Sequence, residues 1–202
     1  MSIPGDKSIS HRSLIIGSLV NGRIEINNLL ESEDILATIN ALRILGAKIN
    51  KLNNKWEVYG SGIGNFYGSN YTLNMGNSGT GARLLMGLIA GSDVEATFVG
   101  DHSLSKRPMK RITTPLKKTG AIIEGQSNNL PIKIKGNKIV LPIEYESSIS
   151  SAQVKSSILI AGLSSLGKTT FIEPSLSRDH TERMLKFFGA NISTCQRDNL
   201  SW

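Results

Sequence analysis

The stretch "GTGARLLMGLIAG", from Gly79 to Gly91, starts with small residues and continues as an almost unbroken apolar run. A helix that is apolar on most of its sides is buried inside a protein rather than lying at its surface. Two other stretches share this design, "KSISHRSLIIGSL" (Lys7 to Leu19) and "SSAQVKSSILIAGL" (Ser150 to Leu163). Each is followed by a short turn and an alternating, strand-like pattern. The sequence therefore predicts three buried helices that share one core.

A second, more amphipathic helix pattern follows in each case and ends in a related string. The strings are "LGAKI", "TGAII" and "FGANI", and they contain Gly46, Gly120 and Gly189. Each glycine lies where a left-handed residue ends a helix, and each is followed by a stretch expected to form a strand. The unit is helix, strand, helix, strand, and its three copies cover about 5–70, 71–140 and 141–202. The predicted fold is α/β (α+β), a single pseudo-threefold lobe (1–202) with buried parallel helices inside and small sheets outside.

Composition and charge limit the functions that this chain can have. The 202 residues are 39% hydrophobic and 19% charged, with a net charge of +7, which is typical of a folded globular protein. A positive balance suits small anionic substrates, whereas an aromatic content of 5% argues against nucleic acid bound by base stacking. Apolar runs are shorter than a membrane span, no secretory signal pattern is present, and the single Cys195 excludes an internal disulfide. We therefore expect a cytoplasmic protein.

One motif match points to a nucleotide site and is rejected on its context. "GLSSLGKTT", from Gly162 to Thr170, has the spacing of a phosphate-binding P-loop. A P-loop follows a strand and opens a helix, whereas this stretch follows a predicted helix and precedes a predicted strand. It is expected to be a plain turn with Lys168 in solvent. The three histidines are not spaced as a ligand pair on one helix, so no metal site is predicted either.

The starts of the predicted helices carry the candidate binding residues. If the three buried helices are parallel, their N-termini meet at one edge, where free N–H groups and positive dipole ends attract anions. Helix capping is an alternative role for Ser8, Ser151 and Ser177 when each is taken singly. Taken together, five helix starts that are rich in Ser, Lys, Arg and Gln predict an anion site. The residues include Lys7, Ser8, Arg12, Asn77, Gly79, Thr80, Arg83, Arg107, Arg111, Ser151, Gln153, Lys155, Ser177 and Arg178.

The motifs "PGDKSISHRS", "GNSGTGAR", "KRPM", "SAQVKSS" and "SRDHTE" closely resemble those of the EPSP synthase family over essentially the whole chain. The resemblance implies a two-lobed enzyme with an active site between the lobes and with no metal or organic cofactor. It implies transfer of the enolpyruvyl group of phosphoenolpyruvate to the 5-hydroxyl of shikimate 3-phosphate, releasing phosphate, in chorismate and aromatic amino acid biosynthesis. Alternatives are a UDP-N-acetylglucosamine enolpyruvyl transferase relative, or a non-catalytic anion- or RNA-binding module on the same fold.

The family is longer than this chain, so the resemblance implies that the chain is the shikimate-3-phosphate-binding lobe. Its expected partners are the two anionic substrates and a second lobe, with no nucleic acid and no membrane. The intact protein is expected to be a monomer, and the chain alone to turn over little.

The resemblance also implies roles for individual residues. Lys7 is the implied catalytic residue and contacts both substrates near the reacting hydroxyl. The implied shikimate 3-phosphate site comprises Lys7, Ser8, Arg12, Ser151, Ala152, Gln153, Ser177 and Arg178. The implied phosphoenolpyruvate site comprises Lys7, Asn77, Gly79, Thr80, Arg107 and Gln153.

Overall fold

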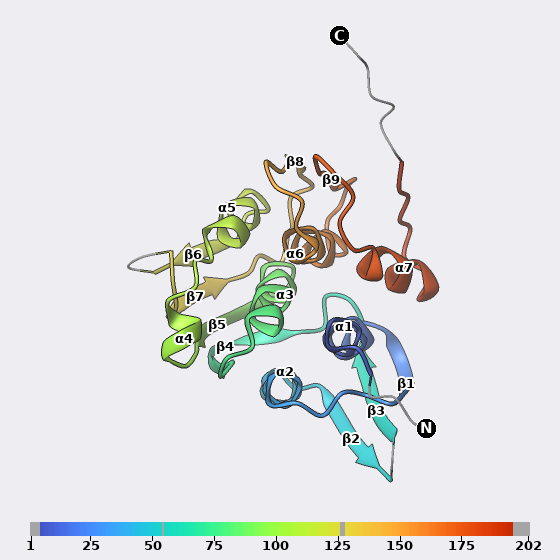
Figure 1. Cartoon of the computed structure of the whole chain (residues 1–202). Coiled ribbons are helices and arrows are strands. Elements are labelled where there is room, and N and C mark those ends of the chain that lie inside the picture. The colour runs from blue at the N-terminus through green and yellow to red at the C-terminus, as the bar shows by residue number, and fades with distance from the viewer. Residues whose placement is uncertain (1–4, 54, 126–127, 196–202) are drawn as a thin grey trace.

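Three central helices organise the computed structural model, which describes residues 5–53, 55–125 and 128–195. They are α1 (Lys7–Ser18), α3 (Gly79–Ala90) and α6 (Ala152–Gly162). Figure 1 looks roughly along them, so that they appear as coils near the middle with the other elements around them. The prediction of three buried helices inside small outer sheets is confirmed.

The outer elements follow the repeated unit. The first sheet has the antiparallel order β1-β3-β2, the second has the order β4-β5-β7-β6, and β8 pairs with β9 in parallel. The second sheet begins at Tyr67, slightly before the expected boundary between the first two repeats. The elements are β1 (Asn21–Asn27), α2 (Glu33–Ile44), β2 (Lys48–Leu52), β3 (Lys55–Ser61), β4 (Tyr67–Asn74), β5 (Asp93–Val99), α4 (His102–Ser105), α5 (Lys110–Lys118), β6 (Ile122–Glu124), β7 (Ile132–Lys135), β8 (Glu144–Glu146), β9 (Thr170–Ile172) and α7 (His180–Phe187).

The three glycines that end the second helices have the predicted left-handed backbone. Their φ angles are 98° at Gly46, 96° at Gly120 and 84° at Gly189. The strand expected after the third glycine is wrong for residues 190–195, which are not in a strand. A strand requires a neighbour, and β2 and β6 pair with β3 and β7, which follow them directly. No equivalent pairing reaches 190–195 within the described residues, and 196–202 lie outside them.

Helices α3 and α6 run parallel and touch through their backbones. A Cβ built on Gly87 would lie 2.8 Å from the Cα of Ser157, and one on Gly91 would lie 3.0 Å from the Cα of Ala161. The contact advances by one helical turn in the same direction on both helices, so the helices are parallel. Glycine permits this approach because a larger side chain would hold the backbones apart.

The segment that follows α6 has the order of elements expected for a plain turn and not that of a P-loop. The helix ends at Gly162, a turn follows, and β9 starts at Thr170, so the order is helix, turn, strand, as predicted. Lys168 is exposed in this turn.

Among the described residues no helix is both long and apolar enough to cross a membrane.

Candidate active site

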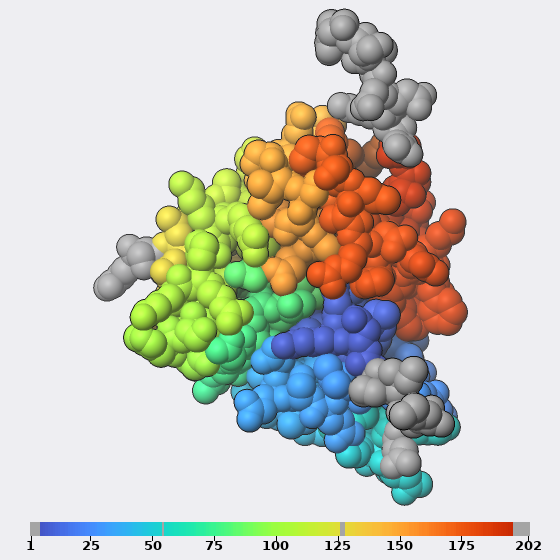
Figure 2. Space-filling model, in the orientation of Figure 1, coloured from blue at the N-terminus to red at the C-terminus, as the bar shows by residue number. Residues whose placement is uncertain are grey.

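Side-chain hydrogen bonds join the first two turns of the three central helices. Arg12 of α1 donates from Nη2 to Ser156 Oγ of α6 at 2.7 Å. Gln153 of α6 donates from Nε2 to Thr80 Oγ1 of α3 at 2.9 Å. The predicted convergence of helix N-termini is thus confirmed. These starts lie in the dark blue, green and orange segments that meet in the middle of the face shown in Figure 2.

The amide of Gln153 is held in one orientation by cations on its other side. Its Oε1 accepts from Arg83 Nη1 at 2.8 Å and from Arg111 Nη2 at 3.4 Å. Arg83 is 6% exposed, and its Nε has no hydrogen-bond partner among the described residues. Burial, together with the charges of Arg111 and Arg107, lowers the pKa of Arg83 to about 10. Arg83 therefore remains charged at neutral pH, and among the described residues no carboxylate forms an ion pair with it.

A cavity of about 510 Å³ opens beside this group. Four of its lining residues are cationic and none is acidic, so it has a positive potential that favours anions. The cations are Arg83, Arg107, Lys110 and Arg111. Arg111 was among the residues predicted at the helix starts, whereas Lys110, its neighbour at the start of α5, was not.

Asn77 and Gly79, two residues of the implied phosphoenolpyruvate site, lie next to Arg107. Arg107 Nη2 donates to Asn77 Oδ1 at 2.5 Å, and a Cβ on Gly79 would lie 3.1 Å from Arg107 Nη1. Asn77 in turn donates to Asp101 Oδ2 at 2.8 Å. Asp101 also caps α4 by accepting from the Leu104 N–H, the main cause that lowers the pKa of its carboxyl. Asp101 was not among the predicted site residues. In the sequence, an Asp directly before a short helix indicates only an N-cap.

Lys7 occupies the first position of α1 with its side chain half exposed, at 51%. Its ammonium forms an ion pair with Asp34 in the first turn of α2. Asp34 was missed because an acidic residue there indicates only a helix start. The geometry leaves Lys7 reachable from solvent while Asp34 restrains it.

Arg12 is almost completely buried, at 1% exposure. Besides Ser156, its guanidinium donates to Thr181 Oγ1 at 2.6 Å and to Ser8 Oγ at 2.5 Å. Burial first, and Arg178 second, lower the pKa of Arg12 to about 10, while Glu182 opposes this shift. Arg12 therefore lies behind the half-buried Ser8 rather than on the open surface.

The capping alternative holds for one of the three serines. Ser151 is the N-cap of α6 and accepts from the Val154 N–H, adjacent to Ala152 at the first helical position. Ser8 lies inside α1, which Asp6 caps, and Ser177 lies before Asp179, the N-cap of α7. The Ser177 hydroxyl donates instead to Glu173 Oε2 at 2.6 Å. Arg178, next to it, is exposed.

The expectation that Lys155 presents its charge to an anion is wrong. Lys155 is 5% exposed, and its Nζ lies 2.7 Å from both Glu173 and Glu182. Both carboxylates come from segments distant in sequence, so the motif around Lys155 could not reveal them.

His11 supplies a testable pH dependence of stability. It is fully buried, its Nδ1 lies 2.9 Å from Thr38 Oγ1, and burial lowers its pKa from 6.5 to about 4. The unfolded chain binds the proton first, so the neutral histidine's contribution is complete above pH 6.5 and decreases as pH falls to about 4. The expected loss over this window is about 3 kcal/mol. Urea unfolding across this range should give a flatter pH profile for His11→Gln.

The matched control is His102→Gln, because His102 is exposed. It should keep the pH profile of the original chain. A His11→Gln profile as steep as that of the control would contradict the assignment.

Comparisons with known sequences and structures all match this chain to one protein family. The sequence model of the family described as EPSP synthase (3-phosphoshikimate 1-carboxyvinyltransferase) matches residues 1–201. The 3-phosphoshikimate 1-carboxyvinyltransferase of Bartonella quintana (strain Toulouse) is 52% identical over 193 residues, covering 95% of this chain and 44% of the relative. That of Zymomonas mobilis is 50% identical over 200 residues, covering 98% of this chain and 44% of the relative.

A solved structure of EPSP synthase from Acinetobacter baumannii has the same fold. It superposes with a TM-score of 0.90 at 43% identity, covering 96% of this chain and 44% of that one. The chain thus spans less than half the length of the relatives it matches. From its motifs, its repeated fold and these similarities, the chain belongs to the EPSP synthase (3-phosphoshikimate 1-carboxyvinyltransferase) family.

Proposed function

We propose that this chain binds shikimate 3-phosphate and supplies one side of an active site completed by a second lobe. The whole protein then transfers the enolpyruvyl group of phosphoenolpyruvate to the 5-hydroxyl of shikimate 3-phosphate and releases phosphate. The observation that carries the proposal is the linkage of the motif residues at the starts of α1, α3 and α6 through Arg12–Ser156 and Gln153–Thr80. We further propose a cytoplasmic location, supported by the lone Cys195.

The two substrates would occupy neighbouring parts of this face. Shikimate 3-phosphate would lie over the start of α6, contacted by Ser151, the Ala152 backbone N–H and the Ser177–Arg178 segment. Its carboxylate would approach Ser8, whose orientation is fixed by Arg12 behind it. A phosphate at the start of α6 gains from the free N–H groups and the positive end of the helix.

Phosphoenolpyruvate would lie toward α3, near Asn77, Gly79, Thr80, Arg107 and Gln153. The amide of Gln153 is already oriented there by Thr80 and Arg83, so binding requires little ordering of this side chain.

Lys7, at the open end of α1, would stabilise negative charge that develops on the 5-hydroxyl oxygen. The reaction would proceed by addition and then elimination through a tetrahedral intermediate. The proton-transfer groups would come from the second lobe.

The test is calorimetric titration of the full 202-residue chain with shikimate 3-phosphate. We expect saturable binding in the micromolar to millimolar range, and a weaker interaction for Lys7→Ala, because a charge-assisted contact contributes about 1.5–3 kcal/mol. Absence of binding would reject the proposal. Steeply salt-dependent binding to unrelated polyanions that is indifferent to Lys7→Ala would instead indicate a general anion-binding module.

Gly79→Ala is expected to weaken the phosphoenolpyruvate site selectively. The added Cβ would lie 3.1 Å from Arg107 Nη1, so this guanidinium must shift by a few tenths of an ångström, whereas the 3.4 Å distance to Arg83 Nη1 is an ordinary contact. A displacement of this size in a binding group predicts about a tenfold loss of phosphoenolpyruvate affinity. The affinity for shikimate 3-phosphate is the internal control and should remain unchanged. Equal losses for both ligands would contradict this assignment of Gly79.

A further inference from the structure

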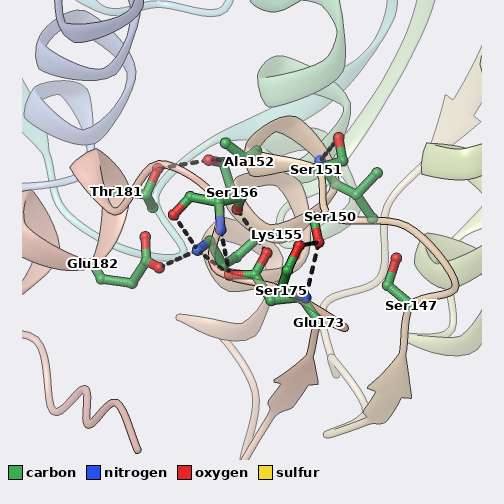
Figure 3. Close-up of polar contacts among 12 residues, drawn as sticks. Ser147, Ser150, Ser151, Ala152, Lys155, Ser156, Glu173, Ser175, Thr181 and Glu182 are labelled. Atoms are coloured by element: carbon green, nitrogen blue, oxygen red, sulfur yellow. Dashed lines mark hydrogen bonds and ion pairs between the residues drawn. The ribbon is translucent and has the colours of Figure 1, made fainter. Parts of the chain in front are cut away.

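A buried lysine joins three segments beside the proposed shikimate 3-phosphate site. Lys155 of α6 is 5% exposed, and its Nζ contacts Glu173 Oε1 and Glu182 Oε1 at 2.7 Å each. Glu173 follows β9, and Glu182 lies in the first turn of α7. Figure 3 shows Lys155 between the two carboxylates. One ammonium group therefore connects α6, the end of β9 and the start of α7.

Glu173 connects the lysine to Ser177. Its Oε1 accepts from the Ser177 backbone N–H at 3.1 Å, and its Oε2 accepts from the Ser177 hydroxyl at 2.6 Å. The same turn is fixed at a second point, where the Ser175 N–H donates to Ser150 Oγ at 3.0 Å (Figure 3). Lys155 Nζ itself lies 3.5 Å from the Ser177 carbonyl oxygen, so the location of the Ser177 backbone relative to α6 is set by bonds to both Glu173 and Lys155.

Glu182 connects the lysine to Arg12. Its neighbour Thr181 accepts from Arg12 Nε at 2.6 Å, and the Thr181 hydroxyl lies 2.6 Å from Ser156 Oγ. The charge of Glu182 also opposes the lowering of the Arg12 pKa. The start of α7 is therefore anchored to α6 through Lys155 and to α1 through Arg12.

Lys155 and Glu173 keep their charges at neutral pH. Burial acts against the Lys155 ammonium, but the hydrogen bonds that it donates to Glu173 and Glu182 and the charges of these carboxylates outweigh burial and raise the pKa of Lys155. Burial likewise acts against the Glu173 carboxylate, and bonds from Lys155 and Ser177 still lower its pKa. Buried ion pairs add little net stability compared with apolar packing. The pairs of Lys155 instead fix the orientation of the Glu173 and Glu182 carboxylates.

We propose that Lys155 is a positioning residue, which acts through Glu173 and Glu182 to hold the Ser177–Arg178 segment where shikimate 3-phosphate binds. The proposal rests on the function proposed above for the ligand. Its structural half, the restraint of Ser177, is independent of that function and can be measured separately.

The test compares Lys155→Met with Lys168→Met in the full chain. Methionine keeps most of the apolar stem and removes the charge, while Lys168 is an exposed lysine beyond the other end of α6. Calorimetry should show that Lys155→Met lowers the affinity for shikimate 3-phosphate about tenfold or more, whereas phosphoenolpyruvate affinity changes less than about twofold. Lys168→Met should match the original chain for both ligands. Glu173→Gln is the second variant, because it keeps the Lys155–Glu182 pair and serves if Lys155→Met does not fold.

Amide hydrogen exchange at Ser177, measured by NMR without ligand, gives the independent readout. Protection of this N–H should fall in Lys155→Met and in Glu173→Gln and stay unchanged in Lys168→Met. If the original chain does not bind shikimate 3-phosphate, the proposed function fails while the exchange data still decide the positioning role. A folded Lys155→Met chain with unchanged Ser177 protection would overturn the proposal, whether or not affinity is lost.

Discussion

Replacing Gly87 by alanine is expected to lower the free energy of unfolding by about 3 kcal/mol, a large effect for one methyl group. The added Cβ would lie 2.8 Å from the Cα and 2.9 Å from the carbonyl carbon of Ser157, and closer still to its oxygen. These are backbone atoms, so no side-chain rotation can relieve the overlap and α3 must separate from α6. The Gln153–Thr80 bond joins the same two helices, so ligand affinity should fall with stability.

The measurement is urea unfolding, with Gly189→Ala as the control. No atom lies within 4 Å of a Cβ built on Gly189, but its φ is 84°. The control therefore isolates the backbone cost of a left-handed alanine, about 1 kcal/mol. A loss at Gly87 no larger than at Gly189 would contradict the prediction that the close contact between the two backbones makes Gly87→Ala severely destabilising.

Arg12→Met is expected to lower both stability and affinity for shikimate 3-phosphate. The substitution removes charge-assisted hydrogen bonds to Ser8, Thr181 and Ser156. Relief of a buried charge offsets part of this, so the expected loss of unfolding free energy is about 2 kcal/mol. Because Ser8 loses its bond to the guanidinium and the start of α7 loses its anchor to α1, affinity should fall about tenfold or more in calorimetry.

Arg12→Lys should not restore binding, since one ammonium cannot reproduce a planar fork that bonds three hydroxyls in different directions. Arg183→Met, an exposed site on α7, is the control and should change neither quantity. Full rescue by lysine would mean that charge alone, rather than the fork, fixes Ser8.

The sequence predicts the fold well because the signals that determine it are local. Apolar runs in α1, α3 and α6 and the left-handed glycines after α2, α5 and α7 can be recognised within a few residues. The expected strand after Gly189 failed because strand formation depends on a neighbour, which local pattern does not report.

The candidate site was predictable in position but not in detail. Helix starts rich in Ser, Lys and Arg indicate where anions bind, and the motifs name most of the residues. Whether a cation faces solvent or is buried depends on partners far along the chain. Lys155 meets Glu173 and Glu182, and Lys7 meets Asp34, through contacts that no spacing rule in α1 or α6 encodes.

The bond between Arg12 and Thr181 has a consequence for biosynthesis. It joins residues 169 positions apart, so α1 leaves the ribosome long before the helix that completes the surroundings of its guanidinium. Until α7 has been synthesised, the Arg12 guanidinium lacks its Thr181 partner and must remain hydrated. The first two repeats alone therefore cannot bury Arg12 as it is buried in the complete structure. Docking of α7 is then the step of cotranslational folding that finishes this end of the lobe. A chain stalled on the ribosome before Thr181 would therefore have an unfinished binding face.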